Sequence, residues 1–443
     1  FKVNHQGTVD RVHSVLMEVT DNCHVENVRS FNSGGNGVHT VLSRTPDVNK
    51  ITVKDRTNVS AGQGYAVQLN SSSFGVVSKI RGEKTRHTVD LAKGSHHISV
   101  SNSFAHKNNE ASYSLHGQNC KSVTIDNCHS VGGTYGFSVG NASFAYDEDI
   151  IINNCTASNA SVFGFFAGLG SKNVEFTNCL ASHTHNGFSL SNTENSSVNG
   201  CKAKETTNKA FVIVNSNQAK LNDVAVTGTN SIAYSIENSE NTVINTVSAS
   251  DVLTGDVGLY ITNSKNTLTD NITLDVEMET GSIIRVTNET VTTYFNNLIV
   301  EGTTPRYALE FVQASNDLTI SNSKIIADVG LDLIRLGTQS TDNVEDILIT
   351  TSTIEMSENS PSNRAIRSQG RNVKLLNNKK SKGYIGLSYD SPTMVIGNTI
   401  DGTLDIRASQ AIYTNNIGNI NVVELAEHDG INIIRENNIE NTA

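Results

Sequence analysis

Short stretches of alternating apolar and polar residues recur along the chain and are clearest between Lys121 and Lys204. Four of them end in a cysteine, at 121–128, 150–155, 173–179 and 197–201. Strict alternation predicts a half-buried β-strand. Successive cysteines are 22 to 27 residues apart, and the intervals contain a second alternating stretch, at 136–140, 164–168 and 187–190. A repeat of this length, built from two short strands, predicts the stacked turns of a solenoid.

Similar stretches continue from 24–28 to 431–434 without an intervening linker. They predict roughly 18 turns that average about 24 residues. One domain over residues 1–443 is allowed, because each repeat buries its apolar face only against its neighbours. The predicted fold is an all-β, single-stranded, right-handed parallel β-helix.

Asparagines at the ends of these stretches support that fold. Asn127, Asn154 and Asn178 are in register in successive repeats, and asparagine tolerates the left-handed backbone that a tight bend needs. The chain lacks the Leu/Asn consensus of leucine-rich repeats, and its period is too short for a propeller. These observations leave the parallel β-helix as the architecture that fits.

The six cysteines are expected to be structural. Four of them, Cys128, Cys155, Cys179 and Cys201, recur at one position of the repeat, which predicts a column of small buried side chains. Cys23 and Cys120 stand in similar Asn-Cys settings and receive the same interpretation. No Cys-x-x-Cys spacing is present, so no zinc site is predicted. We expect neither a metal nor a cofactor.

The ends of the sequence suggest a piece of a longer chain. The sequence starts at Phe1 without a methionine, and no run of 18 apolar residues predicts a membrane span. A solenoid needs its ends covered. We therefore expect flanking domains at both ends, or a homotrimer, to supply that cover.

Residues that do not serve stacking are concentrated in the first half of the chain. Twelve of the 13 histidines lie before residue 186, and the densest region runs from Lys79 to His116. When the second strands of successive repeats are aligned, residues 87–90 lie over 113–116, which lie over 137–140. Alternation then points Arg86, Asp90 and His116 outward.

This alignment makes Asp90 and His116 neighbours on adjacent turns, with Gln68 equivalent on the turn before. A carboxylate beside an imidazole can orient it and raise its pKa, which is one way to build a general acid or base. Arg86, on the same face, could hold an anionic group. The alternative is a solvated surface ladder without a catalytic role. His87 is expected to be a buried histidine in the aromatic column.

Acidic residues offer a second possibility, because glycoside hydrolysis needs two carboxyl groups. The loop 146–149 contains Asp147 and lies near Tyr135, and Glu110 belongs to the preceding turn. Such charges are also common in solvated turns. His183 and His185 have a spacing that metal ligation would accept, but without an acidic or cysteine partner they are interpreted as surface residues.

The net charge of −11 argues against nucleic acid as a partner. A local basic run contrasts with it: Lys79, Arg81, Lys84, Arg86 and Lys93, with Glu83 and Asp90 as its only acids. A basic patch on an acidic protein attracts an anionic ligand. Uronate sugars and phosphate-linked polymers both qualify, and Lys84 and Tyr113 are predicted to contribute to binding.

The repeats, the Asn-Cys ladder, and the strand 86–90 followed by Leu115, His116 and Gly117 resemble the β-helical tailspikes and pre-neck appendages of tailed phages. The resemblance is greatest to those of small podoviruses that infect Bacillus. It covers nearly the whole chain as architecture, but its residue motifs are confined to about 79–140. It implies a homotrimer on the virion, bound to other tail proteins through flanking regions. It also implies that the protein binds and degrades a cell-surface polymer, in this case wall teichoic acid.

Three functions remain open on the sequence. A teichoic acid hydrolase would use His116 as acid or base, Asp90 to orient it, and Arg86 to stabilise negative charge. A lyase or glycoside hydrolase acting on a uronate polysaccharide could use the same face. A non-catalytic receptor-binding adhesin would need only a groove, and replacing Asp90 would then have no effect.

Overall fold

The structure, a computed structural model, consists of parallel β-strands connected by turns. It describes residues 2–4, 13–56, 63–115, 119–140, 146–229, 231–252, 257–313, 315–337, 344–387, 393–406, 410–424, 432–436 and 439–440. Within these ranges no residue is helical, and therefore no helix could span a membrane. The chain divides into two compact units, residues 1–225 and 226–443.

Each turn of the N-terminal unit contributes strands to three parallel sheets. Sheet 1 contains β3 (His24–Glu26), β6 (Asp47–Asn49), β9 (Val76–Ser78), β12 (His96–Ser101), β15 (Lys121–Asp126), β18 (Glu148–Asn153), β21 (Lys172–Thr177), β24 (Ser197–Asn199) and the start of β27 (Lys220–Thr227). Sheet 2 contains β1 (Lys2–Asn4), β4 (Arg29–Phe31), β7 (Thr52–Lys54), β10 (Arg81–Glu83), β13 (Phe104–His106), β16 (His129–Val131), β19 (Thr156–Ser158), β22 (Leu180–Ser182) and β25 (Lys202–Lys204).

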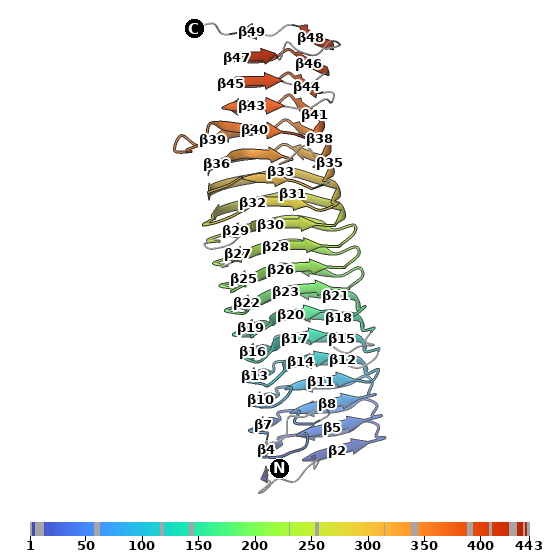
Figure 1. Ribbon diagram of the computed structural model, residues 1–443. Coiled ribbons are helices and arrows are strands. Elements are labelled where there is room, and N and C mark those ends of the chain that lie inside the picture. Colours follow the sequence, from blue (N-terminus) through green and yellow to red (C-terminus); the bar gives the residue numbers. More distant parts are fainter. Residues whose placement is uncertain are drawn as a thin grey trace. The chain divides into compact units, whose positions relative to one another are not determined.

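Sheet 3 of this unit contains β2 (Val15–Glu18), β5 (Val38–Val41), β8 (Val67–Asn70), β11 (Val89–Ala92), β14 (Ala111–Leu115), β17 (Tyr135–Val139), β20 (Phe163–Ala167), β23 (Asn186–Ser191) and β26 (Lys209–Val214). Figure 1 shows β8, β11, β14, β17, β20 and β23 lying one above another. The parallel solenoid is thus confirmed, but a turn has three strands, not two. The additional strand is the three-residue segment of sheet 2, which in four turns directly follows Cys128, Cys155, Cys179 or Cys201.

The C-terminal unit has the same arrangement with longer strands. Its sheet 1 contains β29 (Val243–Ser250), β31 (Lys265–Glu277), β33 (Val291–Thr304), β35 (Asn316–Ser321), β38 (Glu345–Thr350), β41 (Arg371–Leu376), β44 (Thr393–Ile396), β46 (Gln410–Thr414) and β48 (Asn432–Glu436). The second halves of the long strands β29, β31 and β33 belong to its sheet 2, because β33 pairs with both β35 and β36. This sheet continues with β36 (Lys324–Val329), β39 (Thr353–Met356), β42 (Lys380–Lys382), β45 (Thr399–Ile406), β47 (Ile417–Glu424) and β49 (Ile439–Glu440).

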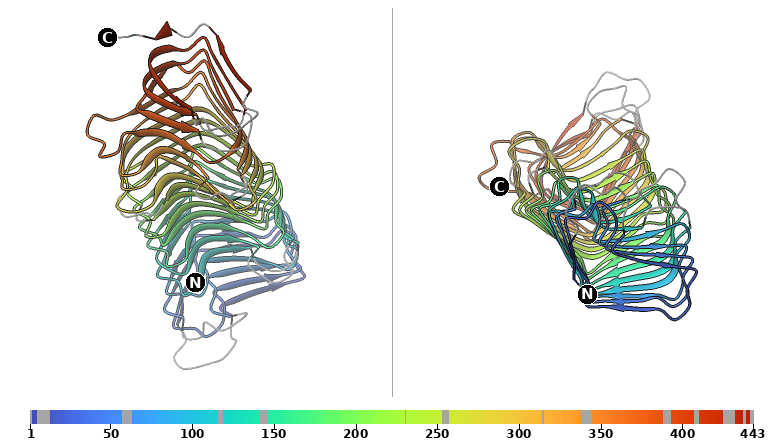
Figure 2. Two further views of the ribbon diagram at one scale, coloured as in Figure 1. Left: turned by 45° about the horizontal axis from the view of Figure 1, so that its top comes forward. Right: turned by 90° about the horizontal axis from the view of Figure 1, so that it is seen from below.

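Its sheet 3 contains β28 (Ile232–Glu237), β30 (Val257–Thr262), β32 (Ser282–Thr287), β34 (Leu309–Phe311), β37 (Asp332–Leu336), β40 (Arg364–Ser368) and β43 (Tyr384–Leu387). β45 pairs with both β42 and β43, so it belongs to sheets 2 and 3. Figure 2 shows the strands of successive turns as parallel layers from two further sides.

Columns of apolar side chains form the core. Tyr113, Phe137, Phe165, Phe188 and Phe211 occupy one inward position of sheet 3, and neighbouring rings stack with centroids 4.7 to 5.0 Å apart. This spacing equals the distance between adjacent strands. The aromatic column predicted from the sequence is therefore confirmed from Tyr113 onward, whereas His87, which was expected in the same column, lies outside it because Val89 is opposite Tyr113.

The predicted turn positions and the column of four cysteines are also confirmed, whereas burial of Cys23 is not. Asn127, Asn154 and Asn178 have φ angles of 50, 50 and 52°, in the left-handed region. Cys128, Cys155, Cys179 and Cys201 are free, buried and stacked, and the backbone N–H of Cys128 donates to Cys155 Sγ at 3.4 Å. Cys120 is also buried, whereas Cys23 is partly exposed.

Candidate functional site

Of the two neighbours predicted for Asp90, the structure confirms one, Gln68. Asp90 lies opposite Gln68 of β8, as predicted, but its partner on β14 is Ser114 and not His116. The predicted alignment is wrong by two residues, because Val89 and not His87 lies opposite Tyr113. His116 itself lies outside the described residues.

Asp90 faces away from the core column but is fully buried, which contradicts the expected exposed position. Its Oδ2 accepts a hydrogen bond from Gln68 Nε2 at 2.8 Å. Gln68 Oε1 in turn accepts from Asn36 Nδ2 at 2.8 Å, and Asn36 Oδ1 accepts from the backbone N–H of Tyr65 at 3.2 Å. Because buried polar groups need such partners, this ladder stabilises the wall of the solenoid.

Two histidines lie beside this ladder. The rings of His13 and His39 meet edge to face with centroids 4.7 Å apart, and His13 Nδ1 accepts from the backbone N–H of Asn36. Burial lowers the pKa of His39 to about 4. His39 is therefore neutral near pH 7, where it could not act as a general acid.

Arg86 belongs to a separate cluster. Its guanidinium lies over the ring of Tyr65, donates to Tyr65 Oη at 3.1 Å, and pairs with Glu110 Oε2 at 2.9 Å. His87 is buried, as predicted, and stacks on Tyr65, with Nε2 3.5 Å from the same Glu110 oxygen. Arg86 and Glu110 thus come together, but Glu110 already occupies the guanidinium that was expected to hold an anion.

Two residues predicted to contact substrate are in the interior. Tyr113 is fully buried in the aromatic column and donates to the backbone carbonyl of His129, and burial raises its pKa. Asp147 is also fully buried, and its carboxylate accepts from the backbone N–H groups of Cys120 and Gly140 at 2.9 and 3.0 Å. Because both side chains are fully buried, the prediction that they contact the polymer is wrong.

Lys84 and Tyr135 remain accessible. Lys84 Nζ pairs with Asp55 Oδ1 at 3.0 Å, so its charge is neutralised locally. Tyr135 is partly exposed, and its ring lies near Phe163 and Phe166 with centroids 6.1 and 5.7 Å away. Their contribution to binding stays a prediction.

The histidine pair 183 and 185 has surface partners. His183 Nε2 pairs with Glu205, and His185 Nδ1 lies 3.0 Å from Thr207 Oγ1. Across the described residues, no three His, Cys, Asp or Glu side chains gather in a way that could hold a metal ion.

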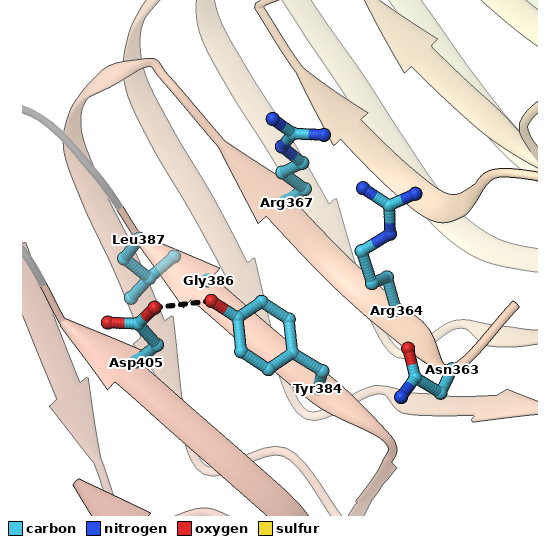
Figure 3. A pocket seen from close by; sticks show the side chains of 7 residues that line it. All are labelled: Asn363, Arg364, Arg367, Tyr384, Gly386, Leu387 and Asp405. Atoms are coloured by element: carbon cyan, nitrogen blue, oxygen red, sulfur yellow. Dashed lines mark hydrogen bonds between the residues drawn. The ribbon is translucent and has the colours of Figure 1, made fainter. Parts of the chain in front are cut away.

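A polar pocket that sequence reasoning missed lies on sheet 3 of the C-terminal unit. It has a volume of about 370 Å³ and is lined by Asn363, Arg364, Arg367, Tyr384, Gly386, Leu387 and Asp405. Asn363 directly precedes β40, and the other residues come from β40, β43 and β45. In Figure 3 the side chains of Arg364 and Arg367 extend from the same strand, and the Tyr384 ring lies between Arg364 and Asp405.

Gly386 allows the aromatic ring to lie in this pocket. Gly386 separates Arg367 from Asp405 in one column of sheet 3, and a Cβ atom on it would lie 2.7 Å from Tyr384 Cε1. Without that atom, the Tyr384 hydroxyl reaches Asp405 and donates to its Oδ2 (Figure 3). Arg367 is exposed and has no ion-pair partner among the described residues.

Buried charged residues next to the pocket form ion pairs with one of its arginines, Arg364, and with the neighbouring Arg335. Asp332 is 2% exposed and pairs with Arg364 Nε at 3.1 Å and with Arg335 Nη1 at 3.5 Å. Burial raises the pKa of Asp332, and the neighbouring guanidinium groups of Arg364 and Arg335 only partly oppose this effect. Arg335 is also buried and donates to Gln369 Oε1 at 3.2 Å, and burial lowers its pKa.

A second buried carboxylate lies on the strand before. Glu310 accepts from Ser282 Oγ at 2.7 Å and faces Arg285 Nε at 3.4 Å and Arg306 Nη2 at 3.7 Å. The arrangement therefore fixes several guanidinium groups on one face, where they could bind carboxylates or phosphates.

No protein-family model matches the chain, and no curated protein sequence matches it. Several solved structures are similar in fold. PfbA, a surface adhesin of Streptococcus pneumoniae, is 12% identical with a TM-score of 0.40, over 65% of this chain and 83% of that chain. The tailspike gp49 of Pseudomonas phage LKA1 is 10% identical with a TM-score of 0.37, over 80% and 50%. The N-terminal fragment of bacteriophage Phi29 gene product 12 is 8% identical with a TM-score of 0.42, over 91% and 82%.

Proposed function

We propose that this protein binds an anionic polymer of a bacterial cell surface and cuts it, as a tailspike-like depolymerase on a virion. The observation that carries the proposal is the pocket on β40, β43 and β45, where Arg364 and Arg367 adjoin the hydrogen-bonded pair Tyr384 and Asp405. Two guanidinium groups beside an acid–base pair suit a substrate with one negative charge per repeat unit.

The arginines would bind and orient the polymer. Arg364 is held by the buried Asp332 through its Nε, whereas Arg367 has no ion-pair partner among the described residues. Arg367 is thus the group most ready to receive a carboxylate or phosphate. On a chain with a net charge of −11, such a local positive site would also attract the anionic polymer to this part of the surface.

Tyr384 and Asp405 would move the proton. In phosphodiester hydrolysis, Asp405 takes a proton from the attacking water as its oxygen bonds to phosphorus. Tyr384 protonates the glycerol oxygen as the P–O bond breaks, and the hydrogen bond between the two residues returns the proton to Tyr384. The guanidinium groups stabilise the charge that develops on the phosphate oxygens.

A uronate polymer is the second candidate substrate, because the same arginines could neutralise its carboxylate. The Tyr384 and Asp405 pair would then take the proton from C5, the C4–O bond would break, and the leaving oxygen would take up a proton. A C4–C5 double bond remains, so the product absorbs near-ultraviolet light. Wall teichoic acid, expected from the resemblance to Bacillus phage appendages, gives no such product.

The predicted centre of Asp90, His116 and Arg86 is the alternative location of the chemistry. The buried position of Asp90 and the Arg86–Glu110 pair favour the C-terminal pocket instead. A homotrimer of right-handed β-helices, attached to tail proteins, is part of the same proposal and would present the face of sheet 3 to the cell wall.

The first experiment measures polymer length. The purified protein is incubated with poly(glycerol phosphate) teichoic acid, a polyuronate and a neutral glucan, and the products are sized and their ultraviolet absorbance is recorded. We expect one of the anionic polymers to be shortened and the glucan to stay intact. Unchanged length for every polymer, with binding retained, would leave the adhesin as the function.

A matched pair of variants then locates the site. Arg367→Gln removes the accessible guanidinium, and a lost charge-assisted contact of about 1.5–3 kcal/mol predicts a roughly 10- to 100-fold weaker interaction. Arg371→Gln changes an arginine of β41 that pairs with Glu345 on sheet 1 and serves as the control. Equal activity in both variants would exclude the pocket.

A further inference from the structure

Charged residues follow one column of sheet 3 beyond the pocket. Arg285, Glu310, Arg335 and Arg367 are opposite one another on the consecutive strands β32, β34, β37 and β40. Tyr260 precedes them on β30. Each of these residues faces away from the core, because its neighbours in the strand belong to the buried apolar column.

The two signs of charge are not equally accessible on this face. Glu310 and Asp332 are 2% exposed and Arg335 is 4% exposed. The side chains of Arg285 and Arg306 are 37% and 44% exposed. The acids are therefore underneath and the accessible donors are guanidinium groups, which the acids hold in place.

The face has a positive balance on an acidic protein. Among the described residues it carries five guanidinium groups, from Arg285, Arg306, Arg335, Arg364 and Arg367, and three carboxylates, from Glu310, Asp332 and Asp405. The excess of two positive charges contrasts with the net charge of −11 of the whole chain. A surface of this kind attracts a ligand with several negative charges.

At the end of this face away from the pocket, Arg285 and Arg306 could form a second subsite for an anion. Arg306 lies over the ring of Tyr307, with Cζ 5.5 Å from the ring centroid, and its Nη2 faces Glu310 Oε1. Arg285 meets the same carboxylate from β32. Tyr307 is itself buried and is covered by Arg306, so the two anchored guanidinium groups are the donors that this end offers to an acidic repeat unit.

We infer that the anionic polymer lies along the stacked strands, from the pocket at β40–β45 to a second anion subsite formed by Arg285 and Arg306. This inference rests on the proposed function, because it extends the same binding face. From β34 to β43 there are three strand spacings, or roughly 14 Å. A ligand of one or two repeat units therefore fills the pocket alone, whereas a longer one reaches both ends.

The test is a length series of two probes, oligogalacturonates and glycerol phosphate oligomers of two to eight units, titrated against the full chain. In the wild type we expect affinity to rise with length until both ends are filled. Arg306→Gln should leave the affinity for dimers unchanged and lower that for hexamers and longer oligomers about tenfold. Glu310 keeps Arg285 and Ser282 as partners in this variant, so the fold should be retained.

Lys324→Gln is the matched control, because Lys324 is an exposed cation of β36 on sheet 2 that pairs with Glu301. It should follow the wild type at every length. Loss of affinity in Arg306→Gln that is equal for short and long oligomers, or no loss at all, overturns the second subsite while the pocket stands. Absence of binding by the wild type at every length overturns both proposals.

Discussion

The aromatic column makes a prediction that tests the inward and outward faces of sheet 3 directly. Phe165 is fully buried and stacks between Phe137 and Phe188, at 4.8 and 4.7 Å with nearly parallel planes. Truncating a buried phenylalanine to alanine costs about 3–5 kcal/mol. Because two ring stacks of about 0.5–1.5 kcal/mol each are lost together, we expect Phe165→Ala to lie at the upper end of that range.

The neighbouring residue provides a control of the same type on the opposite face. Phe166 is only partly buried and touches Tyr135 and Phe163. It contributes nothing to the stacked column, so Phe166→Ala should cost about 1 kcal/mol.

Urea denaturation followed by circular dichroism measures both changes in the free energy of unfolding. Hydrogen exchange should place the loss in β17, β20 and β23, because a solenoid repeat contacts only its neighbours. An equal or greater loss in Phe166→Ala would show that the faces are assigned the wrong way round.

Three further predictions concern polar groups. In the Asp90→Asn variant the new amide oxygen can still accept a hydrogen bond from Gln68 Nε2. We therefore expect the free energy of unfolding to change by less than about 1 kcal/mol and the polymer to be shortened normally. Loss of polymer shortening would show that Asp90 is catalytic after all. Gly386→Ala should displace the Tyr384 ring and reduce shortening with an unchanged melting temperature, and normal shortening would contradict the role of that ring. The pKa of Asp332 is raised in the fold above its unfolded value of about 3.9. Stability should therefore fall as the pH rises from there through the folded pKa, and Asp332→Asn should abolish this slope in thermal melts; parallel curves would contradict it.

The parts of the fold that each repeat encodes locally were predictable. Alternation marks a strand, and Asn127 or Asn154 marks a bend, whatever the rest of the chain does. The third strand of each turn was missed because segments such as Thr156–Ser158 are too short to show a period of two. Only the pairing with neighbouring turns reveals it.

The register between neighbouring turns was less predictable. An error of two residues keeps every side chain on its correct face, since side chains alternate with a period of two. It nevertheless changes every partner between the two strands concerned, β11 and β14, so Asp90 meets Ser114 instead of His116. The side-chain pattern therefore gave the face of Asp90 and its partner Gln68 correctly, but gave neither its partner on β14 nor its burial.

The pocket escaped sequence analysis for a related reason, because a solenoid assembles a site from one or two residues per turn. Arg367 and Asp405, which both line the pocket, are 38 residues apart (405 minus 367), and no local motif connects them. A signal was nevertheless present, since Glu310 stands between Leu309 and Phe311, in strands that otherwise read as apolar.

In several turns of the N-terminal unit, small neutral side chains occupy the outward position beside the aromatic column. Ser114, Ser138 and Ser189 are buried there, whereas the same column holds Asp90 and Phe166 in other turns. Packing therefore does not require a charge at this position in every turn. Burying Glu310 and Arg335 at the same position requires desolvating both charges, and replacing such groups with apolar ones is often neutral or stabilising. What the charges do provide is a rigid support for the accessible guanidinium groups, which the proposed binding of an anionic polymer would need and the stacking of the turns does not.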